Sequence, residues 1–125
     1  MAKHLETGKR GEELALQLLQ SKGFKILETN WRYKRLEVDI IAMDGPVLVF
    51  VEVKTRSYDY FGKPEEFVNS KKERLLAQAA AAYMHQIQHE WSIRFDVVSV
   101  LLHSDEKIEI RHLPDAFFPG LGDAL

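Results

Sequence analysis

Hydrophobic positions in two stretches of the chain recur at the spacing of an amphipathic helix. In residues 8–22 they fall on one side of the predicted helix, and Gly23 follows as a suitable stop. A second helix is predicted to start at Ser70. Its apolar stripe consists of Leu76, Ala79, Ala80, Tyr83 and Ile87.

Five other segments have the composition of β-strands: residues 24–30, 36–43, 47–55, 93–102 and 107–112. The turn signal at residues 44–46 should join the second and third of these as an antiparallel hairpin. The nearly continuous apolar run of 93–102 is typical of a central strand that is covered on both faces. Residues 107–112 suit an edge strand, and the Pro- and Gly-containing residues after them should be irregular.

The order helix, three strands, helix, strand, strand predicts an α/β sheet with a helix packed on it. The 125 residues, 46% of them hydrophobic, should form a single domain over 1–125 with its core at about 8–112. The absence of cysteine excludes disulfides and thiolate metal sites. No apolar run could span a bilayer and no signal peptide is expected, so we predict a cytoplasmic location.

Charge is unevenly distributed, although the formal net charge is only −2. Residues 1–75 carry a balance of +2 and residues 76–125 a balance of −4. Basic patches can follow a phosphate backbone, but they are equally compatible with an ordinary solvated surface. The basic side chains that we expect to contact nucleic acid are Arg10, Arg35, Arg56, Lys71 and Lys72.

The predicted hairpin carries an unusual set of charged residues. Alternation along its first strand predicts a polar face with Glu37 and Asp39 and an apolar face with Val38, Ile40 and Ala42. On its second strand, Glu52 and Lys54 should share one face. We expect Met43 to lie opposite Leu48 across the turn, which fixes the register of the hairpin.

That register would bring two carboxylates together. Asp39 would lie directly across from Glu52, with Cβ atoms about 4.5–5.5 Å apart. Glu37 would lie across from Lys54 in the same way. Facing like charges cost stability, which a divalent cation bound between them would offset. The alternative is a cross-strand ladder of salt bridges in which Lys54 neutralises its carboxylate neighbours.

Glu12 adds a third carboxylate on the buried side of the first helix. It falls within the apolar arc, which consists of Leu14, Ala15, Leu16, Leu18 and Leu19. A carboxylate in such a position needs a partner. Alternatively it is only partly exposed and favoured by the helix dipole. Asp96, at a buried strand, is expected to pair with Arg94 or to cap a turn.

These residues resemble two known groups of proteins. Asp39, Glu52 and Lys54, after a helix that carries Glu12, look like the PD-(D/E)xK nuclease superfamily, and their order resembles the archaeal Holliday-junction resolvases. More closely, the chain resembles the bacterial YraN family (UPF0102), often labelled endonuclease-like, over about residues 8–100. The matching motifs are GKRGE at 8–12, NWR at 30–32, EVDIIA at 37–42, FVEVKTR at 50–56, GxP at 62–64, KK at 71–72 and RFDVV at 94–98.

The superfamily resemblance implies a restriction-endonuclease-like fold, a central mixed sheet flanked by helices, with one or two Mg²⁺ or Mn²⁺ ions. It implies that Asp39 and Glu52 bind metal directly and that Glu12 does so directly or through water. Lys54 would position the attacking water and stabilise charge on the phosphate. Two features depart from the pattern: Val38 stands where a proline often precedes the first Asp, and no Gln-x-x-x-Tyr element ends at Tyr83.

We therefore expect a metal-dependent DNA endonuclease that acts on branched or damaged DNA, with branched or single-strand-containing DNA as its partner and no membrane partner. A homodimer would suit a junction-like substrate, and the sequence leaves the oligomeric state open. The first alternative is a non-catalytic DNA-binding protein that retains the nuclease fold. The second is a protein-interaction module in which the carboxylates make only salt bridges.

Overall fold

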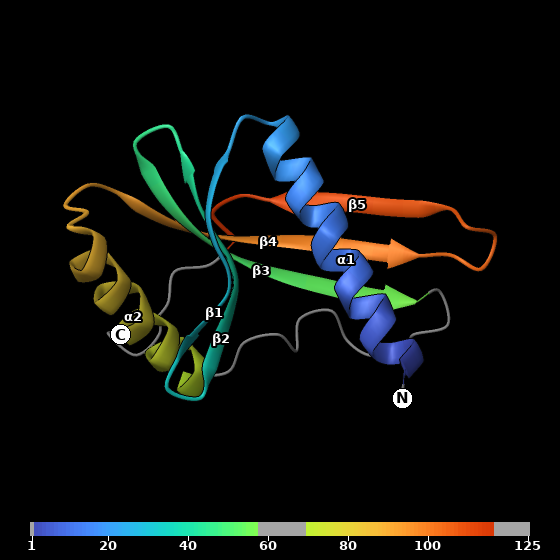
Figure 1. The fold of residues 1–125 in the computed structure, drawn as a ribbon, viewed down its shortest axis with the longest axis horizontal. Coiled ribbons are helices and arrows are strands. Elements are labelled where there is room, and N and C mark those ends of the chain that lie inside the picture. The colour runs from blue at the N-terminus through green and yellow to red at the C-terminus, as the bar shows by residue number, and fades with distance from the viewer. Residues whose placement is uncertain (1, 58–69, 117–125) are drawn as a thin grey trace.

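The computed structural model describes residues 2–57 and 70–116, with the side chains of 7–57 and 71–116. In chain order the elements are α1 (Ala2–Ser21), β1 (Lys25–Tyr33), β2 (Leu36–Asp44), β3 (Val47–Ser57), α2 (Ser70–Ile87), β4 (Ile93–Leu102) and β5 (Ile108–Leu113). The strands form one sheet in the order β1-β2-β3-β4-β5 (Figure 1). It is a mixed sheet, because β3 and β4 are parallel and the other neighbours antiparallel.

This arrangement confirms the predicted α/β class and the predicted order of elements. β4 covers the residues expected of it, β5 is an edge strand, and α2 starts at Ser70. α1 begins at Ala2, earlier than predicted, since residues 2–7 contain no proline or glycine that would stop a helix. β1 extends to Tyr33 because Trp31 and Tyr33 pair with β2 and pack against the core. The predicted irregular tail falls largely on residues 117–125, which lie outside the described residues.

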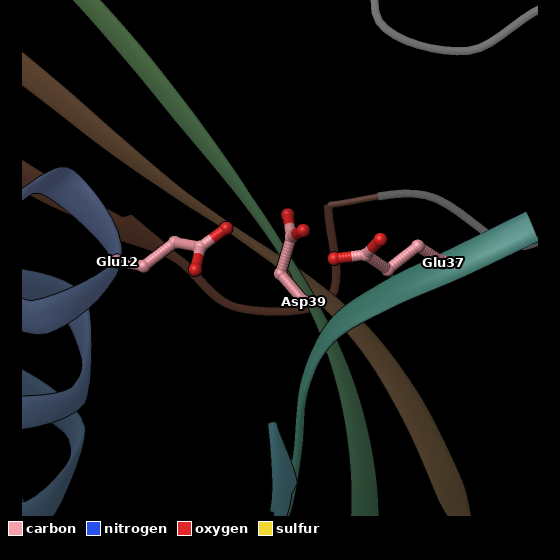
Figure 2. Close-up of side chains that lie close together, drawn as sticks. All are labelled: Glu12, Glu37 and Asp39. Atoms are coloured by element: carbon pink, nitrogen blue, oxygen red, sulfur yellow. The ribbon is translucent and has the colours of Figure 1, made fainter. Parts of the chain in front are cut away.

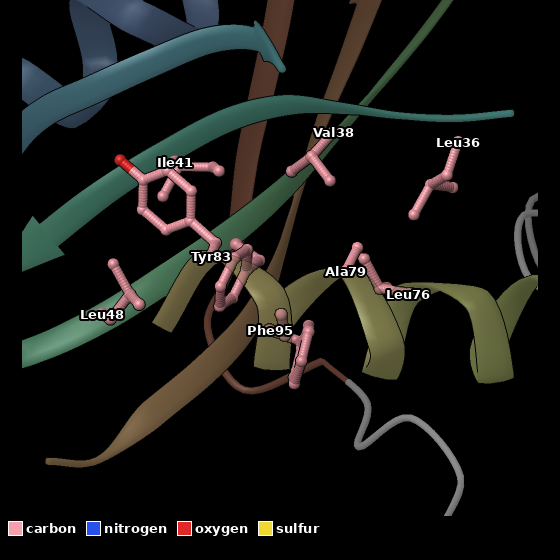
Figure 3. Close-up of a cluster of buried hydrophobic side chains, with 10 residues drawn as sticks. Leu36, Val38, Ile41, Leu48, Leu76, Ala79, Tyr83 and Phe95 are labelled. Carbon is pink, nitrogen blue, oxygen red and sulfur yellow. The ribbon is translucent and has the colours of Figure 1, made fainter. Parts of the chain in front are cut away.

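α1 and α2 cover opposite faces of the sheet. On the α1 side, Ala15 and Leu19 are fully buried in a cluster with sheet residues such as Val49 and Val98. On the α2 side, the predicted stripe packs against Leu36, Leu48 and Phe95, as Figure 3 shows. Ile87, predicted to belong to that stripe, is instead 38% exposed, because it is the last residue of α2. Neither helix is both long and apolar enough to cross a membrane.

The turn between β2 and β3 has the predicted register, with Met43 opposite Leu48. The predicted alternation along β2 is wrong at one point, however. Val38 belongs to the cluster on the α2 side, whereas Ile40 and Ala42 belong to the cluster on the α1 side. The reason is that the described pairing with β3 ends at Ile40, which is opposite Val51. Before that point β2 is no longer held in the plane of β3, so the strand can twist and redirect its side chains.

A buried ionic network anchors β5 to β4. Asp96 is fully buried, and Arg94 donates two hydrogen bonds to its oxygens at 2.8 and 2.9 Å. His112 Nε2 lies 2.7 Å from the same carboxylate, and the backbone N–H of Asp115 donates to it at 2.9 Å. Burial tends to raise the pKa of Asp96, but the hydrogen bonds hold that pKa below its ordinary value. The prediction that Asp96 pairs with Arg94 is confirmed.

α1 can approach β3 closely because Gly11 has no side chain. A Cβ atom there would lie 2.8 Å from Cβ and Cγ2 of Thr55 and would overlap its hydroxyl. Gly11 is itself buried under this contact. The contact therefore sets the distance between helix and strand, and with it the position of the neighbouring Glu12.

We predict that Gly11→Ala lowers the free energy of unfolding by about 1–3 kcal/mol, because the added methyl group overpacks the interface with Thr55. Urea denaturation measures the change. Gly8→Ala is the matched control, since a Cβ at Gly8 meets nothing within 4 Å. Because alanine favours a helix, that control should be neutral or stabilising by up to about 1 kcal/mol. Equal stability of the two variants would show that the approach to Thr55 is not tight.

Candidate metal centre

Three carboxylates from α1 and β2 converge beside the middle of α1. Figure 2 shows Glu12 reaching from α1 toward Asp39, with Glu37 of β2 approaching from the other side. One oxygen of each carboxylate lies within 4.8 Å of the other two. Glu12 and Asp39 are partly buried, and Glu37 is exposed. The site is therefore open to solvent on the side of Glu37.

Asn30 of β1 links two of these carboxylates. With its amide oriented to donate, Asn30 Nδ2 lies 3.2 Å from Glu12 Oε2 and 3.3 Å from Glu37 Oε1. Its backbone has a φ of 52°, in the left-handed region that asparagine tolerates better than most residues. This conformation lies inside a strand, where Asn is itself uncommon. Asn30 thus holds the two glutamates near each other without supplying a positive charge.

Asp39 is the carboxylate of this group with the largest shift in pKa. Its Oδ2 accepts a hydrogen bond of 2.7 Å from the backbone N–H of Val53. Burial, together with the charges of Glu12, Glu52 and Glu37, raises the pKa of Asp39 to about 6, although this hydrogen bond acts to lower it. Burial also raises the pKa of Glu12, with Glu37 adding to the effect. The hydrogen-bond donors described near Asp39 and Glu12 therefore do not fully offset the negative charge that is concentrated at this site.

Glu52 lies near Asp39 but makes different contacts. Its Oε1 accepts a hydrogen bond of 2.6 Å from Lys72 and lies 2.9 Å from Lys54 Nζ. Asp39, Glu52 and Lys72 line a cavity of about 20 Å³, which is room for about one water molecule. Because the described pairing of the strands stops at Ile40, the ladder does not hold Asp39 directly opposite Glu52 as expected. Glu37, predicted to lie across from Lys54, lies with Asp39 and Glu12.

The geometry of the three carboxylates fits a hard divalent cation. Oxygens that bind one Mg²⁺ lie about 2.0–2.1 Å from it, so no two of them are more than about 4.2 Å apart. The three carboxylate oxygens all lie within 4.8 Å of one another, which is close to this spacing. Small side-chain rotations, or one water between a carboxylate and the ion, would close the difference. The donors are all carboxylate oxygens, which Mg²⁺ and Mn²⁺ prefer.

The basic residues expected to contact nucleic acid lie on α1, β3 and α2 and in the turn between β1 and β2. Arg10 is exposed on α1, directly before the buried Gly11, and Arg35 is exposed in the turn between β1 and β2. Arg56 of β3 is partly buried and donates to the carbonyl of Thr55 at 2.8 Å. Lys71 is exposed in the first turn of α2, whereas its neighbour Lys72 points to Glu52.

The sequence does not predict Glu37 or Asn30 at this site. Regular alternation along the strand predicts Glu37 opposite Lys54, and the strand pattern predicts Asn30 only as the end of a strand. A signal for Asn30 did exist, because a polar, turn-forming residue within a strand pattern often marks a bulge or special backbone position. No comparable signal identifies Glu37, whose position depends on the twist of β2.

A model described as "Uncharacterised protein family UPF0102" matches residues 11–100. This chain belongs to the UPF0102 family. It is 45% identical over 118 residues to the UPF0102 protein FP2501 of Flavobacterium psychrophilum, covering 94% of this chain and 98% of that protein. It is 46% identical over 114 residues to UPF0102 protein THEYE_A1950 of Thermodesulfovibrio yellowstonii, covering 91% and 97%. A UPF0102 protein of Rhodococcus opacus is 41% identical over 118 residues, covering 94% and 100%.

The UPF0102 match confirms the family resemblance that the sequence motifs predicted. It also spans every residue of the carboxylate cluster and of the adjacent Glu52, Lys54 and Lys72. The candidate metal centre therefore lies wholly within the part of the chain that defines UPF0102.

We predict that Asp39→Asn stabilises the metal-free protein at neutral pH. A pKa raised from 3.8 to about 6 means that the folded state holds this proton more tightly than the unfolded state. The stabilising contribution of Asp39 is thus fully present below about pH 4 and is lost as the pH rises through 6. This loss lowers the free energy of unfolding by at most about 3 kcal/mol. The asparagine keeps the acceptor for Val53 and has no charge to bury.

Urea denaturation in EDTA at pH 4.5 and pH 7.5 tests this linkage. The stability gap between Asp39→Asn and wild type should widen toward pH 7.5. Glu90→Gln is a control for loss of an exposed carboxylate, and it should behave as wild type at both pH values. A gap that is constant or narrows with rising pH would contradict the proposed burial of the Asp39 charge.

Proposed function

We propose that this protein is a metal-dependent DNA endonuclease that hydrolyses phosphodiester bonds in branched or damaged DNA. The observation that carries the proposal is the convergence of Glu12, Glu37 and Asp39, beside Glu52 and Lys54. Such a group of carboxylates costs stability unless something positive occupies it. Its resemblance to the PD-(D/E)xK nucleases and to the archaeal Holliday-junction resolvases supports this reading and suggests the substrate class.

In this proposal Asp39 and Glu12 would hold Mg²⁺ or Mn²⁺, directly or through water, and Glu37 would be a third ligand. Glu52, the other ligand that the resemblance implies, would join them by giving up an ion pair with Lys72 or Lys54. The bound ion would lower the pKa of a coordinated water and neutralise charge on the phosphate. The cluster is exposed at Glu37, and a DNA strand would reach the site from that side.

The protein's own groups would organise the attack. Lys54, fixed by its ion pair with Glu52, would orient the attacking water and stabilise charge on the phosphate. Water adds to phosphorus, one P–O ester bond breaks, and a proton passes from the water to the leaving oxygen through solvent. Asp39, held by the N–H of Val53, would not need to rotate during this step.

The alternative is a DNA-binding protein that retains the fold without turnover. One contact favours it: Glu52 is already neutralised by two ammonium groups, which compete with any cation for this carboxylate. Under this alternative DNA binding is salt-dependent and survives loss of Glu52, whereas cleavage is absent.

We predict that Mn²⁺ or Mg²⁺ raises the melting temperature of the wild-type protein, since an ion that binds only the folded state stabilises it by mass action. At 100 times the dissociation constant the gain is about 2.7 kcal/mol. Asp39→Asn and Glu12→Gln should reduce the shift strongly, and Glu90→Gln should preserve it. If no divalent ion shifts the melting temperature of wild type, the cluster only makes internal polar contacts.

We predict that wild type cleaves DNA in Mn²⁺ or Mg²⁺ and that Asp39→Ala and Lys54→Ala reduce the rate by 100-fold or more, on the order of the loss of one catalytic group. The assay compares four-way junctions, flaps and linear duplexes, with circular dichroism to verify folding. Glu90→Gln serves as the control of full activity. Equal rates for wild type and both alanine variants would exclude the proposed active site. Binding without cleavage by wild type would favour the alternative.

A further inference from the structure

The tip of the hairpin between β1 and β2 presents a compact group of cations. Arg32, Lys34 and Arg35 lie within four consecutive residues, and all three are exposed. Arg32 carries a side chain that is 72% exposed, and its Nη2 lies 3.2 Å from Glu37 Oε2. Because Glu37 belongs to the carboxylate cluster, the tip begins one side chain away from the candidate metal centre.

Lys34 adopts a backbone conformation in which residues other than lysine are usually found. Its φ is 55°, in the left-handed region where glycine and asparagine are favoured and a long side chain carries a cost. A hairpin turn selected only for stability would place one of those residues here. Lysine at this position is therefore better explained by its charge than by the turn.

Packed aromatic side chains support the cations of the tip. The rings of Tyr33 and Trp31 stack with centroids 6.1 Å apart, and Trp31 meets the buried Tyr83 of α2 edge-on at 5.1 Å. Lys34 Nζ lies 5.3 Å from the ring centroid of Tyr33. The aromatic side chains thus connect the tip to the core, and the ammonium group of Lys34 lies against the ring of Tyr33.

One further cation, Lys72, lies beside the tip on α2. Leu36, the residue that follows the turn, packs in the same cluster as Leu76 of α2, as Figure 3 shows. Lys72 lies one turn before Leu76 and lines the small cavity together with Leu36 and Glu37. The tip and the start of α2 therefore form one basic rim on the side of the metal centre away from α1.

We propose that this hairpin tip grips the phosphate backbone of DNA through Lys34 and Arg35 and guides the strand over the carboxylate cluster. The inference rests on the proposed function. Arginine and lysine contacts to phosphate position a protein on DNA but carry no sequence information. The tip should therefore act equally on any sequence, in keeping with recognition of DNA structure.

Fluorescence anisotropy with a labelled four-way junction and a linear duplex, in EDTA and over a series of salt concentrations, tests the proposal. Lys34→Asn and Arg35→Gln should each weaken binding to both DNAs. Each should also reduce the slope of log K against log [salt] by about 0.9, and the double variant by about 1.8. Arg111→Gln on β5, at the opposite edge of the sheet, is the matched control and should leave the slope unchanged.

Thermal melting separates a charge effect from a folding effect. Lys34→Asn should melt at or above the wild-type temperature, because asparagine tolerates the left-handed backbone better than lysine. A binding loss that accompanies a fall in melting temperature, with Arg35→Gln binding normally, would assign Lys34 a structural role and overturn the proposal.

The outcomes also distinguish this inference from the proposed function. If wild type binds and cleaves DNA while both tip variants and the double variant behave like wild type, the tip proposal fails alone. If the tip variants lose binding and wild type never cleaves, the tip proposal stands and the catalytic proposal fails. If wild type binds neither DNA at low salt, both fail.

Discussion

The hydrogen bond from the backbone N–H of Val53 to the Asp39 carboxylate joins the architecture of this protein to its site. It lies where β2 stops pairing with β3, just beyond the last described pair, Ile40 with Val51. A strand that leaves a sheet abandons backbone donors, and a buried donor needs an acceptor. Asp39 supplies that acceptor with its side chain. The carboxylate is thereby held between the departing strands, within reach of Glu12 on α1.

The fully buried Asp96 and the partly buried Asp39 show opposite solutions to the same electrostatic problem. Asp96 is surrounded by donors from Arg94, His112 and Asp115, and its pKa is lowered despite full burial. Asp39 has one described donor and carboxylate neighbours, and its pKa is raised to about 6. The first arrangement stabilises the fold. The arrangement at Asp39 leaves unfavourable electrostatic energy around one carboxylate, which is typical of a site that binds a positive ligand.

The sequence was sufficient for features that depend on local patterning. The apolar run of β4, the register across the turn at Gly45, and the position of Glu12 in the apolar arc of α1 could all be predicted. Features that depend on where two strands separate could not be predicted from the sequence. Period-two alternation assumes continuous pairing, and that assumption misplaced Val38 and left Glu37 out of the cluster. The close approach allowed by Gly11 likewise follows from three-dimensional packing against Thr55.

The salt-bridge interpretation of the charged residues accounts for only part of the site. It describes Glu52 well, since two ammonium groups lie within 3 Å of one of its oxygens. It does not describe Glu12 and Asp39, because the charges that shift the pKa of each belong to other carboxylates. Asn30 reduces the repulsion with an amide and adds no charge. Had neutralisation been the only requirement, a basic residue at position 30 would meet it better. An amide leaves the negative charge undiminished and therefore available to a cation, which is the arrangement a metal centre requires.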